Sequence, residues 1–199
     1  NLPFTYLKNI ATDLLKILPI GARVDGELYR HGMEFEHIAS IVNSETDRFV
    51  TCEDTGVQLW NESDIQIHVY DYILDIESAS KPFKTRLQDL NNLFKDFTSL
   101  YVIPVKTDTV KSLSELESYF NTYIIEKYEG VMVRNAEGIY EYGYRSLFLF
   151  KYKKMIESEF KILNILESEN EPGQPVFVVE VSTNVSCNVR KEGSKLDNE

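Results

Sequence analysis

The stretch Leu147–Lys153 reads LFLFKYK and alternates with the two-residue period of a β-strand. The odd positions run from leucine to Lys151 and Lys153, whereas every even position is aromatic. Residues two apart on a strand share a face, so both ammonium groups can reach the same anion. A surface strand with two solvated lysines would give the same pattern. The strongly apolar positions before the lysines favour a cleft.

A second strand is predicted upstream, over Tyr128–Arg134. Its alternation puts Glu129 on one face with Val131 and Val133, which are expected to be core. A carboxylate on such a face has to be paired, hydrated or bound to a metal. The neighbouring Gly130 would allow a ligand to approach the backbone closely. A glutamate at the start of an ordinary strand remains an equal alternative.

Two further stretches carry polar groups on predicted strands. In DGEL, Asp25 and Glu27 share a face and could bind a divalent cation or ribose hydroxyls, although a simple turn beside a solvated glutamate fits as well. In Ile65–Leu74, isoleucines and valine alternate with polar residues, which include Tyr70. The ring of Tyr70 could stack on a nucleobase, or be only a half-exposed strand residue.

The remaining pattern predicts an α+β fold in two domains. Residues 1–155 form the first domain, and residues 156–199, where short strands and turn residues take over, begin a second. In the first domain, apolar periodicity predicts four helices and two more strands; the helices are Leu7–Leu18, Phe35–Val42, Phe83–Phe97 and Ser112–Tyr128, and the strands are Val24–Tyr29 and Leu100–Val105.

Composition sets the outer limits. The 199 residues carry a net charge of −11, which argues against a nucleic-acid partner for the whole surface. A local basic stretch remains between Arg145 and Ile165, with five basic residues against Glu157 and Glu159. No apolar run reaches the ~18 residues of a membrane span. Cys52 and Cys187 form no metal-binding or disulfide pattern, which suits a reducing compartment.

The motifs DGEL, VYDYI, EGVMVR and LFKYKK occur in the order typical of covalent nucleotidyltransferases, and the set resembles ATP-dependent DNA ligases most closely. Glu27 and Glu129 are 102 positions apart and Glu129 and Lys151 are 22 apart, as in small viral and phage ligases. The resemblance implies an ATP-grasp-like nucleotidyltransferase domain of antiparallel sheets with flanking helices. The strands after residue 156 resemble the start of an OB-fold β-barrel.

The resemblance also implies roles for single residues. Glu27 would contact the adenosine ribose and Tyr70 would stack on adenine. Glu129 would bind the catalytic Mg²⁺ or Mn²⁺, while Lys151 and Lys153 would act in catalysis by binding the phosphates of ATP and then the adenylate. The implied activity is sealing of nicks in duplex DNA in replication, repair or recombination, through lysyl-adenylate and DNA-adenylate intermediates. We expect an intracellular monomer, cytoplasmic, nuclear or viral, without membrane contact.

One family motif is missing. Family members attack ATP with the lysine of a Lys-x-Asp-Gly sequence, and here only Arg23-Val24-Asp25-Gly26 imitates it. Arginine is too basic to be a nucleophile near neutral pH. We therefore expect the chain to be a fragment that lacks this motif upstream and most of the barrel downstream, and to be inactive alone. An RNA ligase, a capping guanylyltransferase and a non-catalytic nucleotide- or DNA-binding remnant are the alternatives.

Overall fold

The computed structural model describes residues 7–44, 49–144, 146–154, 158–168, 172–182 and 185–190. The chain divides into two compact units, Asn1–Lys153 and Lys154–Glu199, and each is described by itself. The predicted domain boundary between residues 155 and 156 lies outside the described residues, as do Arg145 and Glu157 of the basic stretch.

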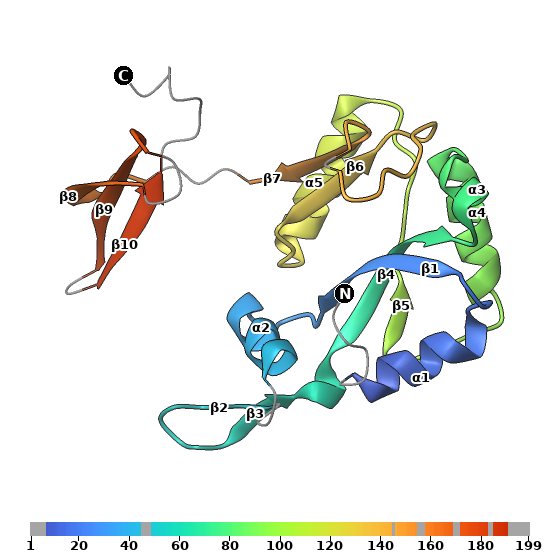
Figure 1. Ribbon diagram of the computed structural model, residues 1–199, viewed down its shortest axis with the longest axis horizontal. Coiled ribbons are helices and arrows are strands. Elements are labelled where there is room, and N and C mark those ends of the chain that lie inside the picture. Colours follow the sequence, from blue (N-terminus) through green and yellow to red (C-terminus); the bar gives the residue numbers. More distant parts are fainter. Residues whose placement is uncertain are drawn as a thin grey trace. The chain divides into compact units, whose positions relative to one another are not determined.

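The first unit contains helices at both ends of a central sheet and a separate hairpin (Figure 1). In chain order its elements are α1 (Lys8–Ile17), β1 (Arg23–Tyr29), α2 (Phe35–Asn43), β2 (Phe49–Thr51), β3 (Gln58–Asn61), the 3₁₀ turn η1 (Glu62–Asp64), β4 (Gln66–Ile73), α3 (Ile76–Ala79), α4 (Phe83–Phe94), β5 (Val102–Pro104), α5 (Leu113–Ile125), β6 (Gly130–Arg134) and β7 (Leu149–Lys153).

The central sheet has the strand order β1-β4-β5. β1 and β4 are antiparallel, with a register shift between Asp25 and Gly26, whereas β4 and β5 are parallel. The expectation of antiparallel sheets is therefore wrong for β5. The connection between β4 and β5 contains α4, and a crossover of this kind returns the chain in the same direction.

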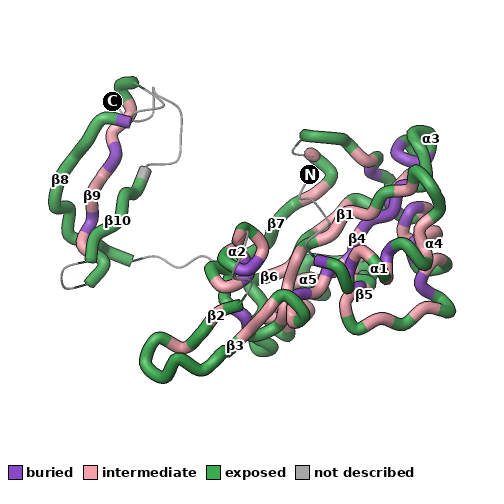
Figure 2. Tube along the Cα trace, turned by 60° about the horizontal axis from the view of Figure 1, so that its bottom comes forward, coloured by how far each residue is buried: buried purple, intermediate pink, exposed green. Residues whose placement is uncertain are grey.

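The core of the first unit is formed by buried residues of α1, α2, β4, α4 and β5; the buried positions along β4 and α4 can be followed in Figure 2. As predicted for one face of this strand, Ile65, Ile67 and Val69 are buried. They meet Ile10 of α1 and Leu90 of α4, and the side chains of all five are almost fully removed from water. Their burial supplies the hydrophobic stabilisation that orders the opposite, polar face of β4.

The predicted helices form with slightly different ends. α4 stops at Phe94 instead of Phe97, and α5 starts after Ser112, whose hydroxyl accepts a hydrogen bond from the Glu115 N–H (3.2 Å) and caps the helix. Leu15, predicted to lie on the apolar face of α1, is instead 81% exposed. The short β2–β3 hairpin and α3 were not predicted, because their three or four residues show no clear period.

A second layer of the first unit is the antiparallel β6–β7 hairpin with α5 against it (Figure 1). The ring of Phe120 in α5 contacts that of Tyr152 in β7 at 4.6 Å between centroids. This contact involves the aromatic face predicted for β7, although Phe150 and Tyr152 remain 60% and 40% exposed.

The second unit contains β8 (Lys161–Glu167), β9 (Pro175–Ser182) and β10 (Val185–Arg190) in an antiparallel sheet of order β10-β9-β8. Short strands were predicted in this region and are found, while its assignment to the start of an OB-fold stays a prediction. Among the described residues, no helix has the length and apolar character needed to cross a membrane.

Candidate functional site

The two lysines of the opening stretch lie on one face of the β6–β7 hairpin. Lys151 pairs in register with Met132, and Lys153 with Gly130. Their side chains are 55% and 41% exposed. The neighbouring ammonium of Lys153 lowers the pKa of Lys151, whereas the Glu129 carboxylate raises the pKa of Lys153. The pair presents two accessible cations from one strand face.

Glu129 joins these lysines. Its carboxylate forms an ion pair with Lys153 and lies 3.9 Å from the Nζ of Lys151. The contact with Lys153 lowers the pKa of Glu129, so the group is ionised at neutral pH. The expectation that Glu129 shares a core face with the valines of β6 is wrong, because the residue precedes the strand and its side chain is 73% exposed.

Gly130 is the first residue of β6 and directly follows Glu129. The paired strand leaves no room for a side chain at this position. A Cβ there would lie 2.2 Å from the carbonyl oxygen of Tyr152 on the paired strand. Its φ of +157° also lies at the edge of the region that L-residues avoid. The glycine lets β7 approach closely, and so brings Lys153 next to Glu129.

Tyr70 lies half-buried on the polar face of β4. Its hydroxyl donates to Asp25 Oδ1 (3.1 Å), and Tyr140 donates to Asp25 Oδ2 (2.9 Å). Burial, reinforced by the charges of Asp25 and then Glu27, raises the pKa of Tyr70 to about 12. Burial and Asp25 also raise the pKa of Tyr140. Both phenols remain donors at neutral pH and hold Asp25 between them.

A buried charge cluster lies directly beside Tyr70. Asp71 is fully buried and accepts two hydrogen bonds from Arg86, from Nε at 2.9 Å and from Nη2 at 3.0 Å. Arg134, the last residue of β6, donates from Nη1 to Asp71 Oδ2 at 2.6 Å. The guanidinium carbon of Arg134 is also 5.0 Å from the centre of the Tyr70 ring. This contact joins the β6–β7 hairpin to the central sheet.

The loop after Arg134 strengthens the same junction through its backbone. The N–H groups of Phe83 and Lys84, at the start of α4, donate to the carbonyls of Gly138 and Ala136 at 2.9 Å each. The Tyr140 N–H donates to the Ala79 carbonyl, also at 2.9 Å. The hairpin is therefore attached to α3 and α4 by main-chain as well as side-chain contacts.

Glu27 is exposed on β1. At the register shift between Asp25 and Gly26 the extra residue is Tyr70 on β4, which has no partner on β1. The shift inserts no residue between Asp25 and Glu27, so their shared face stays a prediction. The charge of Glu27 is a minor cause of the raised pKa of Tyr70 and of Lys153, and it partly offsets the lowering of the pKa of Lys151 by Lys153, so it acts on both halves of the site.

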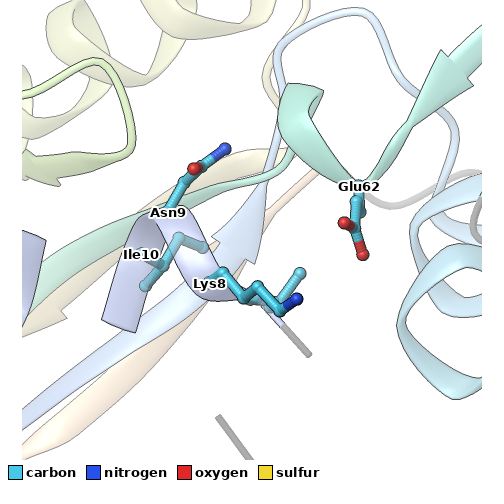
Figure 3. Close-up of a pocket in the computed structure, with 5 residues that line it drawn as sticks. Lys8, Asn9, Ile10 and Glu62 are labelled. Atoms are coloured by element: carbon cyan, nitrogen blue, oxygen red, sulfur yellow. The ribbon is translucent and has the colours of Figure 1, made fainter. Parts of the chain in front are cut away.

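One shallow hollow, of about 110 Å³, lies elsewhere, between the start of α1 and η1 (Figure 3). It is lined by Leu7, Lys8, Asn9, Ile10 and Glu62. None of these belongs to the predicted site. The hollow is small and contains none of the candidate side chains, so we do not include it in the candidate site.

The described residues contain no group of three or more His, Cys, Asp or Glu side chains that could bind a metal ion unaided. Mg²⁺ is usually held in nucleotide sites by one or two carboxylates together with substrate phosphates and water. Glu129 is an ionised and exposed carboxylate beside the ammonium groups of Lys151 and Lys153, which could bind phosphates. It therefore fits that arrangement.

Known proteins are similar to this chain in sequence and in fold. The family model described as "ATP dependent DNA ligase domain" matches residues 4–153, which correspond to the first unit. The chain belongs to this family. It is 32% identical over 173 residues to a DNA ligase of African swine fever virus (strain Badajoz 1971 Vero-adapted), covering 83% of this chain and 38% of that protein.

Other DNA ligases give the same result. The ligase of Enterobacteria phage T4 is 26% identical over 191 residues, with 83% of this chain and 39% of that protein covered. Among solved structures, a ligase of the Lig E group has a TM-score of 0.64 at 25% identity, covering 88% of this chain and 64% of that chain. The adenylate form of the Chlorella virus DNA ligase has a TM-score of 0.55 at 20% identity, covering 94% and 68%, and supports the fold.

This member of the ATP-dependent DNA ligase domain family spans less than two fifths of the curated relatives it matches. The comparisons confirm the resemblance inferred from the four motifs and the mixed helix and sheet fold. Sequence reasoning missed Arg86, Arg134 and Tyr140. The available signal was Asp71, an acidic residue in the middle of an apolar strand, because such a group needs a cationic partner.

Proposed function

We propose that the protein containing this chain is an ATP-dependent DNA ligase that seals nicks in duplex DNA. Family membership supports the class of reaction. The arrangement of the side chains supports two binding regions. One binds the nucleoside of ATP around Tyr70, and the other binds its phosphates around Glu129, Lys151 and Lys153.

The proposed chemistry has three balanced steps. A lysine amine attacks the α-phosphorus of ATP, a nitrogen–phosphorus bond forms, and pyrophosphate leaves as the amine loses its proton. An oxygen of the 5′-phosphate at the nick then attacks the adenylyl phosphorus, and the nitrogen–phosphorus bond breaks as the lysine amine leaves and regains its proton. Finally the 3′-hydroxyl attacks that phosphate and AMP leaves. The attacking lysine belongs to a Lys-x-Asp-Gly motif, which these 199 residues do not contain.

On the nucleoside side, Tyr70 is the stacking platform for adenine and Glu27 accepts hydrogen bonds from the ribose hydroxyls. Stacking on an aromatic side chain is worth roughly 1–3 kcal/mol per base. The exposed carboxylate of Glu27 lies near both Tyr70 and the lysines, which suits a group that bridges base and phosphates.

On the phosphate side, Lys151 and Lys153 neutralise the phosphate oxygens of ATP and later of the adenylate. Glu129 is the protein ligand for the divalent ion, for which we propose Mg²⁺, with Mn²⁺ as a substitute. When bound, the ion would stabilise the negative charge that develops on the phosphates. In the described structure Lys153 already forms an ion pair with Glu129, so the two groups lie close enough to share one phosphate array.

The observation that carries the proposal is the placement of β6. Glu129 precedes this strand, beside both lysines, and Arg134 ends it, against the ring of Tyr70. One strand therefore connects the two groups of side chains that an adenine nucleotide needs. We also propose that the protein acts inside cells, as a monomer, on nicked duplex DNA.

The test uses the full-length protein and a duplex with one labelled 5′-phosphate at a nick. We expect sealing with ATP and Mg²⁺, weaker or no sealing with GTP, and preference for DNA over RNA strands at the nick. Sealing confined to RNA would favour an RNA ligase. Transfer of GMP without sealing would favour a capping enzyme, and nucleotide binding without either reaction would identify a remnant.

A further inference from the structure

Arg134 makes two contacts of different kinds from the end of β6. Its Nη1 donates to Asp71, and its guanidinium carbon lies 5.0 Å from the centre of the Tyr70 ring and 4.7 Å from that of Phe83. The side chain is only 16% exposed. A guanidinium at this distance from an aromatic face forms a cation–π contact, which is stronger where water is excluded.

Asp71 keeps Arg134 in place. The carboxylate is fully buried and accepts two hydrogen bonds from Arg86, whose side chain is 2% exposed. The Tyr72 N–H donates a further hydrogen bond to it at 2.9 Å. A group held from three directions cannot rotate freely, and the planar guanidinium of Arg134 takes its orientation from it.

Tyr70 is consequently fixed at two places beyond its own backbone. The hydroxyl is tied to Asp25 and the ring is contacted by Arg134. The residue stays half-buried, so part of the ring remains accessible. A ring whose rotamer is already fixed loses less conformational entropy when a ligand stacks on it.

We infer that Arg134 is a positioning residue for nucleobase recognition, which acts by holding the ring of Tyr70 in the orientation that stacks on adenine. This inference rests on the proposed function. It assigns Arg134, and Asp71 through it, a part in binding the base and none in binding the phosphates, although the same strand begins beside Glu129.

The experiment separates base binding from phosphate binding in the full-length protein. The probes are an ATP analogue with a methylene group between the α- and β-phosphorus, which cannot transfer its adenylyl group, and inorganic tripolyphosphate. Calorimetry gives the affinity for each, and their ratio reports the contribution of the nucleoside. The variants are Arg134→Gln, Arg134→Lys and, as a matched control, Lys84→Gln, which removes an exposed ion pair with Glu137 near the same loop.

We expect Arg134→Gln to weaken the analogue by roughly 2- to 30-fold, the range of a cation–π contact, with tripolyphosphate affinity unchanged. Lys84→Gln should change neither. In a Tyr70→Leu background, Arg134→Gln should have no further effect, because Arg134 acts through that ring. If Arg134→Gln fails to fold, Arg134→Lys provides the test, because it keeps a cation beside Asp71 but loses the planar guanidinium group. Arg134→Lys should weaken binding of the analogue and leave binding of tripolyphosphate unchanged.

An equal loss for both probes in the Arg134 variants would overturn the inference. A full additional loss in the Tyr70→Leu background would do the same. A wild-type protein that prefers the analogue, with the preference intact in both Arg134 variants, overturns the inference but leaves the proposed function standing. A wild-type protein with no preference for the analogue over tripolyphosphate contradicts the proposed function itself.

Discussion

Glu129 and Lys153 form an ion pair at the end of the β6–β7 hairpin that is farthest from its connecting loop. Both side chains keep substantial exposure, 73% and 41%. Exposed ion pairs contribute little net stability, so exchanging this contact for a metal ion and a phosphate would cost little. The pairing is therefore compatible with the proposal that both residues bind one nucleotide.

The first prediction concerns Glu129→Ala in the full-length protein. We expect loss of metal-dependent adenylate transfer without loss of the fold, because this exposed side chain adds little to stability. Thermal unfolding and nick sealing are measured on the same preparation. A variant that seals at the wild-type rate would remove Glu129 from the metal site.

The second prediction concerns the two lysines. Lys151→Ala and Lys153→Ala should each lower sealing by tens to hundreds of fold, since a hydrogen bond to a charged phosphate is worth about 1.5–3 kcal/mol. The double variant should lose less than the product of the single effects, because both lysines bind one phosphate array. Lys154→Ala is the matched control, and an equal loss there would indicate that only local positive charge matters.

The third prediction separates the ring of Tyr70 from its hydroxyl. Tyr70→Phe keeps the stacking surface and removes one hydrogen bond to Asp25, which still accepts from Tyr140. Nucleotide affinity should therefore remain close to that of the wild type. Tyr70→Ala should weaken ATP binding by about 5- to 150-fold, the equivalent of 1–3 kcal/mol. Unchanged affinity in the alanine variant would leave Tyr70 a purely structural residue.

The fourth prediction concerns the buried cluster. Asp71→Asn should destabilise the fold by about 3–5 kcal/mol, because two guanidinium groups lose the charge that compensates their burial. Urea unfolding measures the change. Glu137→Gln, which breaks the exposed ion pair with Lys84, should cost less than about 1 kcal/mol under the same conditions. Similar losses in the two variants would contradict the role assigned to burial.

The fifth prediction is a loss of stability at alkaline pH. The pKa of Tyr70 rises from about 10 in the unfolded chain to about 12 in the native protein. The native state therefore binds more protons over this interval, and its stability must fall as pH rises from 10 towards 12. Tyr70→Phe should make the free energy of unfolding less dependent on pH there. An unchanged slope would show that the Tyr70 hydroxyl is not perturbed.

Local patterns predicted most of the elements. The alternation in Ile65–Leu74 identified the buried face of β4, and the apolar periodicity before residue 97 identified α4, because each pattern follows directly from the geometry of a strand or helix. Short elements such as β2 and β3 give too few residues to show a period. The parallel pairing of β5 depends on a crossover, which local periodicity does not report.

The residues of the candidate site were likewise identified from the sequence only in part. The motifs identified Glu27, Tyr70, Glu129, Lys151 and Lys153 as candidates, and their roles stay predictions. The residues that join them were missed because their contacts span long stretches of sequence. Arg134 is 63 positions from Asp71, and Tyr140 is 115 from Asp25. Acidic residues next to a buried run show that a partner is needed, but only the tertiary fold specifies which one.

The main-chain attachment of the loop after β6 has a consequence for how this sequence can vary. Carbonyl groups at positions 136 and 138 accept the hydrogen bonds from α4, and every residue type offers a backbone carbonyl. The exposed side chains at 135–137 take no part in these two hydrogen bonds, so changing them leaves the attachment to α4 in place, although Glu137 also pairs with Lys84 and Asn135 accepts from the Glu137 N–H. Gly138 cannot be changed in this way, since a Cβ there would lie 2.6 Å from that of Phe148. A loop that varies around one fixed glycine would be the mark of this junction in related chains.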